Sequence, residues 1–220
     1  MPTSVYAPYE QQLQKLLQDA AGKVSQAQQD IAIDEAVNIR FSADRPRVLV
    51  SDITGNDTND LPLPVGEDGS EWEDGFSTFL WIEFPIGNVP ESFIDPSDWR
   101  MYRTPTGLFL RLLATVPDDT DTIRVTWTVR QTPSTVPAGD FQAVCCYAAA
   151  LCFESMAASY IQTMDAAIAG DTVNYRTKAQ ECMGVAKAFR TRYYNHIGTS
   201  EAASGGMAKP AATVCSAQLR

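Results

Sequence analysis

Residues 140–197 read DFQAVCCYAAALCFESMAASYIQTMDAAIAGDTVNYRTKAQECMGVAKAFRTRYYNHI. In the first half, residues 141–168, apolar residues recur at steps of three and four, which is the spacing of one helix face. This face consists of Phe141, Val144, Ala148, Leu151 and Ser155. The other faces are rich in Ala, Cys and Met. We therefore expect a helix that is buried on several sides, by its own domain or by neighbouring subunits.

The second half predicts an amphipathic helix that ends in bulky aromatic residues. Its apolar face consists of Tyr175, Ala179, Cys182, Ala186, Phe189 and Tyr193. Between the two helices, Gly170 can end the first in the left-handed conformation, and Asp171 can cap the second. We predict that residues 135–198 fold as an antiparallel helical hairpin.

The composition excludes several classes of protein. The chain has 220 residues, a formal net charge of −10 and a pI near 4.5. This charge argues against a nucleic-acid-binding protein, because such binding depends on Lys and Arg. We find no apolar run long enough to cross a bilayer, and the N-terminus lacks the basic start and apolar core of a signal peptide. We therefore expect a soluble protein made in the cytoplasm, without a membrane partner.

Five cysteines are present, and four of them fall within the predicted hairpin. They are Cys145, Cys146, Cys152, Cys182 and Cys215. A free thiol in an apolar helix behaves as a small hydrophobic group, so we interpret these residues as reduced core cysteines. No CxxC pair occurs, and a zinc or redox site is not supported.

Residues 1–42 predict two helices. Apolar residues between Tyr9 and Ala21 mark a short amphipathic helix that stops at Gly22. Ser25 and Gln28 form a capping-box pattern that begins the second helix. Its apolar stripe, which we assign to core packing, consists of Ile31, Ala32, Ala36, Val37, Ile39 and Phe41.

Residues 43–134 predict an inserted β region, a small antiparallel sheet of four or five strands. Strands are expected around Val48–Ile53, at residues 76–84 and 122–130, and in a hairpin that turns at Thr104–Gly107. The last strand alternates apolar residues with Thr and Arg, which predicts one buried and one wet face.

Residues 54–75, TGNDTNDLPLPVGEDGSEWEDG, combine Gly, Pro, Asn and acids with few core candidates. We predict a long exposed loop whose acids are solvated. A calcium loop is the alternative, but the DxDxDG order with a closing glutamate is missing.

Residues 199–220 are small, weakly patterned and too poor in large apolar groups to build a core. We expect an extended tail, which either docks on a partner as a strand or remains an uninvolved terminus. Its candidate docking residues are Met207, Lys209, Pro210, Val214, Leu219 and Arg220.

No catalytic pattern is apparent. His196 is the only histidine, and its place at the end of the last helix is explained by the helix dipole. The sequence lacks GxSxG, HExxH, GxGxxG and Walker-type motifs, so we expect no enzyme, cofactor or metal. The alternative left open is an active site made of carboxylates alone.

Four stretches of the chain together carry a resemblance to a known family. They are DIAIDEAVNIRFSADRPR at 30–47, WIEFPIGNVP at 81–90, DWRMYRTPTG at 98–107 and, above all, residues 135–198. Their order resembles that of tailed-phage head-to-tail adaptors, the connector proteins that form a ring beneath the portal. The likeness covers most of the chain, except residues 54–75 and the tail.

This resemblance implies an α+β protein: a helical bundle with an inserted β region, assembled as a ring of twelve subunits in the virion neck. The ring would join the portal to a stopper or tail-completion protein and let DNA pass without sequence-specific binding. The tail would reach the portal. We take Phe189, Tyr193 and Tyr194 as plausible subunit-interface residues.

The alternative is a cytoplasmic ligand-binding protein or enzyme, with a cleft between the β region and the hairpin. It would use Trp81, Trp99, Tyr102 and Trp127. Such residues are more often core, because they are large apolar groups at strand spacing.

Overall fold

The computed structural model describes residues 5–164 and 172–198, with the backbone alone for residues 19, 21, 163, 164 and 172–177. Helices and antiparallel strands are both present, which confirms the predicted α+β class. The chain divides into two compact units. Unit 1 comprises Met1–Arg45 and Gln131–Arg220, and unit 2 comprises Pro46–Arg130. The sequence prediction had set the limits of the β region at residues 43 and 134.

Unit 1 is helical. Its elements are α1 (Ala7–Leu17), η1 (Gln18–Lys23), α2 (Gln26–Asp34), η2 (Glu35–Phe41), α3 (Ser42–Asp44), α4 (Phe141–Met164) and α5 (Thr172–Ile197). Ser25 caps α2, and the reciprocal bonds between Ser25 and Gln28 confirm the predicted capping box. The predicted Gly170–Asp171 junction and the tail, residues 199–220, lie outside the described residues.

The predicted core stripe of the second helix is wrong at two positions. Ile31 is 66% exposed and Ile39 is 60% exposed, whereas Val37 and Phe41 are fully buried. Ile39 lies in η2, a π-helix with more residues in each turn than an α-helix, so a strict 3.6-residue period assigns its face incorrectly. Ile31 lies earlier, in α2, off the face formed by the buried residues Gln29, Ala32 and Ile33.

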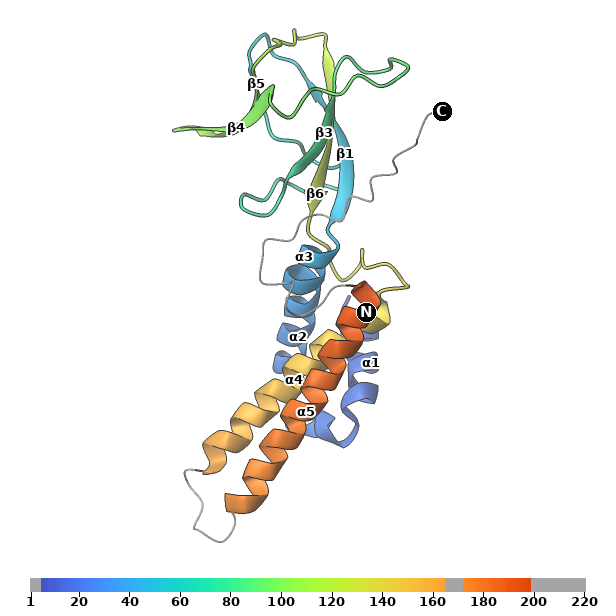
Figure 1. The fold of residues 1–220 in the computed structure, drawn as a ribbon, viewed down its shortest axis with the longest axis vertical. Helices are drawn as coiled ribbons and strands as arrows, with labels where there is room; N and C mark the ends of the chain where they lie inside the picture. Colours follow the sequence, from blue (N-terminus) through green and yellow to red (C-terminus); the bar gives the residue numbers. More distant parts are fainter. Residues whose placement is uncertain (1–4, 165–171, 199–220) are drawn as a thin grey trace. The chain divides into compact units, whose positions relative to one another are not determined.

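Helix α4 lies at the centre of unit 1, where it contacts α1, α2, η2 and α5. Figure 1 shows α4 and α5 side by side. Every residue from Ala143 to Ala150 is buried. Helices of the same chain thus bury these residues of α4 on several sides, as predicted. A neighbouring subunit is not needed to cover them.

The apolar run in α4 corrects one expectation from the sequence. Phe141–Gln162 is long and apolar enough to cross a membrane by length and composition. Core helices of soluble proteins meet the same criterion, however, and 56% of the most apolar window is buried inside the protein. The burial favours a core helix.

The apolar face predicted for α5 packs against α4. The rings of Tyr147 and Tyr193 have centroids 5.0 Å apart, and those of Phe153 and Phe189 stack at 5.9 Å. Ala186 is fully buried beside them. The side chain of Tyr175, assigned to the same face, lies outside the described residues.

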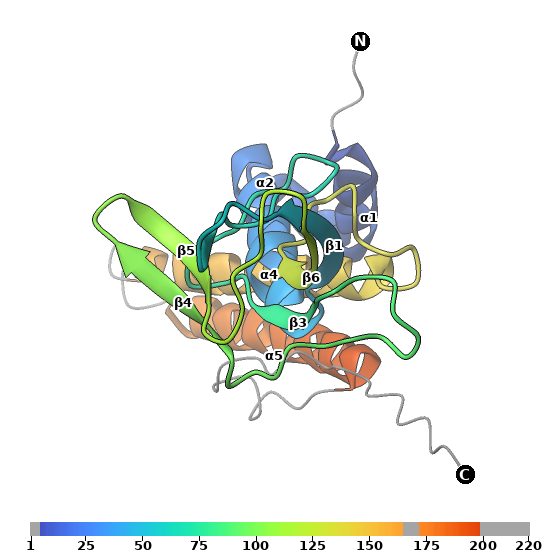
Figure 2. The same ribbon diagram turned by 90° about the horizontal axis from the view of Figure 1, so that it is seen from above.

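Unit 2 contains six strands. They are β1 (Arg47–Thr54), β2 (Asp60–Leu61), β3 (Phe79–Glu83), β4 (Trp99–Thr104), β5 (Gly107–Leu112) and β6 (Thr122–Val129). They form two three-stranded sheets, β1-β6-β3 and β2-β5-β4, where we had predicted one sheet. Figure 2 shows the β4–β5 hairpin beside the first sheet. The predicted turn is confirmed, because Thr104 pairs with Gly107.

The segment predicted as an exposed loop, residues 54–75, contributes to the core of unit 2. It contains β2, and Leu61 is fully buried. Trp72 stacks on Trp127 with centroids 5.9 Å apart and contacts Phe79 at 4.5 Å. The Ser51 hydroxyl donates to the Val65 carbonyl at 3.0 Å. The prediction from a turn-like composition therefore missed the packing of Leu61 and Trp72 in this core.

Candidate interaction surfaces

A polar cluster in unit 1 holds the only histidine of the chain. Asp140 precedes α4 and is buried. Its Oδ1 lies 2.8 Å from Nε2 of His196 on α5 and accepts a hydrogen bond from Nη1 of Arg45 at 2.7 Å. The imidazole thus has a specific carboxylate partner, beyond the helix-dipole role expected from the sequence.

A second carboxylate, Asp44, lies in the same unit. It accepts two bonds from Arg40 at 2.9 Å and one from the Tyr193 hydroxyl at 2.7 Å. Burial, and then the bond to Asp44, raise the pKa of Tyr193, so this phenol stays protonated. The two clusters link α3, η2, the start of α4 and the end of α5. We interpret their role as stabilising the packing of these elements.

The described cysteines do not form a nucleophilic site. Cys145, Cys146 and Cys152 are buried, as expected for core thiols, and Cys182 is half-buried. Burial raises the pKa of Cys145 and Cys152 to about 12, so both remain neutral thiols. Cys215 lies outside the described residues. Among the residues that the structure describes, no His, Cys, Asp or Glu group is placed to hold a metal ion.

The acids of residues 54–75, which we had interpreted as solvated, are partly engaged in ion pairs. Five pairs cross unit 2: Arg47–Asp68, Arg103–Asp74, Arg111–Asp60, Arg124–Asp52 and Arg130–Glu73. Arg111 also lies over the Tyr102 ring at 3.3 Å, and Arg130 lies over Phe76 at 4.4 Å. The arginines therefore hold this segment to the sheets.

The net charge of the chain is concentrated in unit 2. Residues 46–130 contain 15 acids, six arginines and no lysine, a net charge of −9 out of −10 for the whole chain. The structure describes all of residues 46–130, and five of the 15 acids form ion pairs with arginines there. The other ten acids have no ion-pair partner within unit 2. Unit 2 thus presents a surface on which acidic groups outnumber basic ones.

One face of the β1-β6-β3 sheet is apolar and exposed. The register places Val50, Thr126 and Trp81 in one row across the three strands. Val50 is 54% exposed and Trp81 is 46% exposed, with Val48 exposed next to Val50. The adjacent row is charged, with Arg124 between Asp52 and Glu83. We call these residues the outer sheet face.

The outer sheet face was not predicted from the sequence. We had expected Trp81 to belong to the core, but it is 46% exposed. We had also predicted one solvent-exposed face for the last strand, but Thr126 and Thr128 on that face are buried. The usable signal was local, since Trp81 and Glu83 lie two residues apart and so share a face of β3. The register shift between Phe79 and Trp81 could not be predicted from β3 alone.

The other aromatic residues of the ligand-binding alternative are engaged inside unit 2. Trp127 is fully buried, and its Nε1 donates to the Ser51 hydroxyl at 3.1 Å. Trp99 meets Phe79 edge-on at 5.6 Å. These contacts give both tryptophans a packing role.

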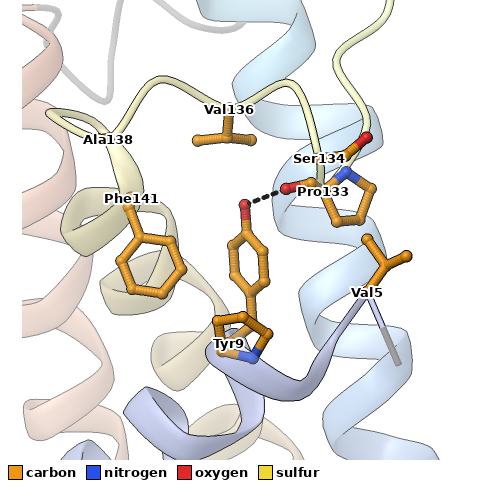
Figure 3. Close-up of a pocket in the computed structure, with 8 residues that line it drawn as sticks. Val5, Tyr9, Pro133, Ser134, Val136, Ala138 and Phe141 are labelled. Carbon is orange, nitrogen blue, oxygen red and sulfur yellow. Dashed lines mark hydrogen bonds between the residues drawn. The ribbon is translucent and has the colours of Figure 1, made fainter. Parts of the chain in front are cut away.

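Unit 1 carries an apolar groove, drawn in Figure 3, of about 390 Å³. It lies between the start of α1, residues 133–138 and the start of α4. The Tyr9 hydroxyl donates to the Pro133 carbonyl at 2.9 Å, and the Tyr9 and Phe141 rings lie 4.7 Å apart. Val5, Pro8, Val136 and Ala138 complete its apolar lining, and Ser134 also lines it.

The residues predicted for the subunit interface are covered by other parts of unit 1. Phe189, Tyr193 and Tyr194 are all buried in the core of unit 1. In this conformation they offer no surface to a neighbouring subunit, because α4 and η2 already cover them. The predicted portal-binding residues lie outside the described residues: Met207, Lys209, Pro210, Val214, Leu219 and Arg220.

Comparisons of the chain with protein-family models, curated proteins and solved structures found no match.

Proposed function

We propose that the chain is a structural protein of the virion neck in a tailed phage, made in the cytoplasm of the bacterial host. In this role it is a head-to-tail adaptor: a ring, of twelve subunits in the resembled family, that joins the portal to a stopper or tail-completion protein. Unit 1 corresponds to the helical bundle with its C-terminal hairpin, and unit 2 to the inserted β region. Residues 199–220 extend to the portal.

The observation that carries this proposal is the charge of unit 2. A protein that surrounds moving DNA must not bind its phosphates, and binding to phosphate depends on accessible Lys and Arg. Unit 2 has a net charge of −9, and five of its six arginines are held by its own acids. Such a surface repels DNA and supports passage without adhesion.

Exposed apolar residues supply candidate contacts between subunits. A closed ring requires two different patches on each subunit, which meet head to tail. The outer sheet face, with Val50 and Trp81, is one candidate patch. Ile31 and Ile39, exposed on α2 and η2, form the second. These residues replace Phe189, Tyr193 and Tyr194 in our interface proposal.

The proposal is tested by mixing the purified chain with the portal protein of the source phage and imaging the mixture by electron microscopy. We expect a ring of this chain on one end of the portal. A chain lacking residues 199–220 should fold with an unchanged circular dichroism spectrum and bind the portal at least tenfold more weakly. Heads and tails that join normally without this chain would exclude an adaptor role.

A substitution separates ring formation from portal binding. Trp81→Ser removes the largest exposed apolar group of the outer sheet face, so the variant should bind the portal as incomplete rings. Val89→Ser is the matched control, because Val89 is 98% exposed in unit 2 outside the six strands. Equal ring formation by both variants would remove the outer sheet face from the interface.

A further inference from the structure

The apolar groove of unit 1 suits an extended peptide better than a charged ligand. Its lining contains two prolines, Pro8 and Pro133, and the neighbouring rings of Tyr9 and Phe141. No charged side chain lines it. The Tyr9 hydroxyl is already engaged with Pro133, which leaves the groove few directional polar groups. Grooves lined by aromatic residues and proline recognise proline-containing extended segments in many proteins.

The chain itself contains such a segment. Residues 207–214 read MAKPAATV, in which Pro210 has its φ fixed at about −65° and disfavours the helical conformation at Lys209. The segment has one charge and several small apolar side chains, which match a shallow apolar lining. A restricted segment also loses little conformational entropy when it binds.

The path from the last described residue to the groove is short. His196 lies two residues before Gly198, and its Nε2 is 2.8 Å from Asp140. Asp140 directly precedes Phe141, which lines the groove. The end of α5 therefore lies at the start of α4, where the groove opens. The nine Cα-to-Cα steps from Gly198 to Met207 span up to about 30 Å, which is ample for this distance.

We propose that residues 207–214 of the same chain bind in the groove formed by Val5, Tyr9, Pro133, Val136 and Phe141. The segment covers apolar surface that unit 1 leaves open. This docking concerns the chain on its own and is tested without the portal. In the proposed function the same residues leave the groove when residues 199–220 reach the portal.

Disulfide trapping tests this docking in the full chain. Ala138→Cys at the groove is combined with Ala211→Cys, in a background of Cys182→Ser and Cys215→Ser. A disulfide requires the two Cα atoms to approach within about 7 Å. We expect an intramolecular disulfide to form under mild oxidation at a rate independent of protein concentration, detected by mobility on a non-reducing gel.

Val185→Cys with Ala211→Cys is the matched control, because Val185 is 39% exposed on α5 and does not line the groove. We expect its disulfide to form at least tenfold more slowly. Equal rates for the two pairs would overturn the proposal. Disulfide-linked dimers in place of the intramolecular product would also overturn it, since the occupant would then be a second copy.

A measurement without new cysteines checks the same contact. The methyl resonances of Val5 and Val136 are followed by NMR in the full chain and in a chain lacking residues 207–214. We expect both to shift on deletion, while those of Val48 and Val50 in unit 2 stay in place. Unchanged Val5 and Val136 resonances would show that the segment does not occupy the groove.

Discussion

At the scale of single residues, Asp140 joins segments of unit 1 that are far apart in the sequence. It is buried and bonds to Arg45 and His196, which lie 95 and 56 residues away in sequence. The sequence could not predict these partners, because a contact at such separation depends on the tertiary fold. It did predict the core thiols and the α5 face from local spacing.

We predict that Asp140→Asn destabilises unit 1 by about 1–3 kcal/mol, since the hydrogen bonds to Arg45 and His196 lose their anionic acceptor. Helical circular dichroism at 222 nm during urea unfolding measures this change. Asp52→Asn is the comparison, because both members of its pair with Arg124 are over 40% exposed. Since Asp52 lies in unit 2, tryptophan fluorescence follows the unfolding of this variant. Its cost should stay below about 1 kcal/mol. Equal costs would contradict the role given to Asp140.

The buried thiols predict a loss of stability at alkaline pH. Cys145 and Cys152 have a folded-state pKa of about 12, against an ordinary value of 9.0. Between these two values the unfolded chain releases thiol protons that the folded chain retains, so stability is complete below pH 9 and falls above it. At pH 10 we expect a loss of about 1.4 kcal/mol for each thiol.

Urea unfolding at pH 8 and pH 10, followed at 222 nm, measures this loss. The double variant Cys145→Ala/Cys152→Ala should lose less stability between the two pH values, whatever its stability at pH 8. An identical pH dependence in both proteins would assign the effect to other groups, such as Tyr9, whose pKa burial raises to about 12.

At the scale of elements, local signals predicted structure well where local contacts determine it. The capping box at Ser25 and the hairpin at Thr104–Gly107 were predicted from neighbouring residues and were confirmed. Residues 54–75 were predicted incorrectly, because Leu61 and Trp72 pack against distant strands. The π-helix likewise escaped a search that assumes 3.6 residues per turn.

Leu61→Ala should therefore destabilise unit 2 by about 2–5 kcal/mol, because it leaves a cavity in a closed core. Tryptophan fluorescence measures this, since all four tryptophans lie in unit 2. Val65→Ala is the control in the same segment, and at 59% exposure it should change stability by less than about 0.5 kcal/mol. A small loss of stability in Leu61→Ala would instead support the sequence-based prediction that residues 54–75 form an exposed loop.

At the scale of the whole molecule, each unit has a separate hydrophobic core. The chain leaves unit 1 after Arg45 and re-enters it at Gln131, and these two residues are bonded, with Nε2 of Gln131 3.1 Å from the Arg45 carbonyl oxygen. The backbone N–H of Gln131 also donates to the Ser42 hydroxyl at 2.8 Å. The apolar periodicities and the family resemblance predicted the α+β class, but not this closed junction.

We predict that unit 1 folds when residues 46–130 are replaced by two glycines, because Arg45 and Gln131 are already adjacent. The shortened chain should keep a helical spectrum and a cooperative transition at 222 nm. Replacing residues 47–129 by the same two glycines gives a control with an equivalent junction. A disordered spectrum in both would show that unit 1 depends on unit 2.

The junction has a thermodynamic consequence for the intact chain. Without structure between them, Arg45 and Gln131 would be the ends of a free 85-residue loop, and bringing them together would cost about 4 kcal/mol of chain entropy. In folded unit 2, β1 and β6 pair from Arg47 with Val129 onward, which holds those ends together. Folding of unit 2 thus lowers the entropic barrier to forming unit 1, even without any contact between their cores.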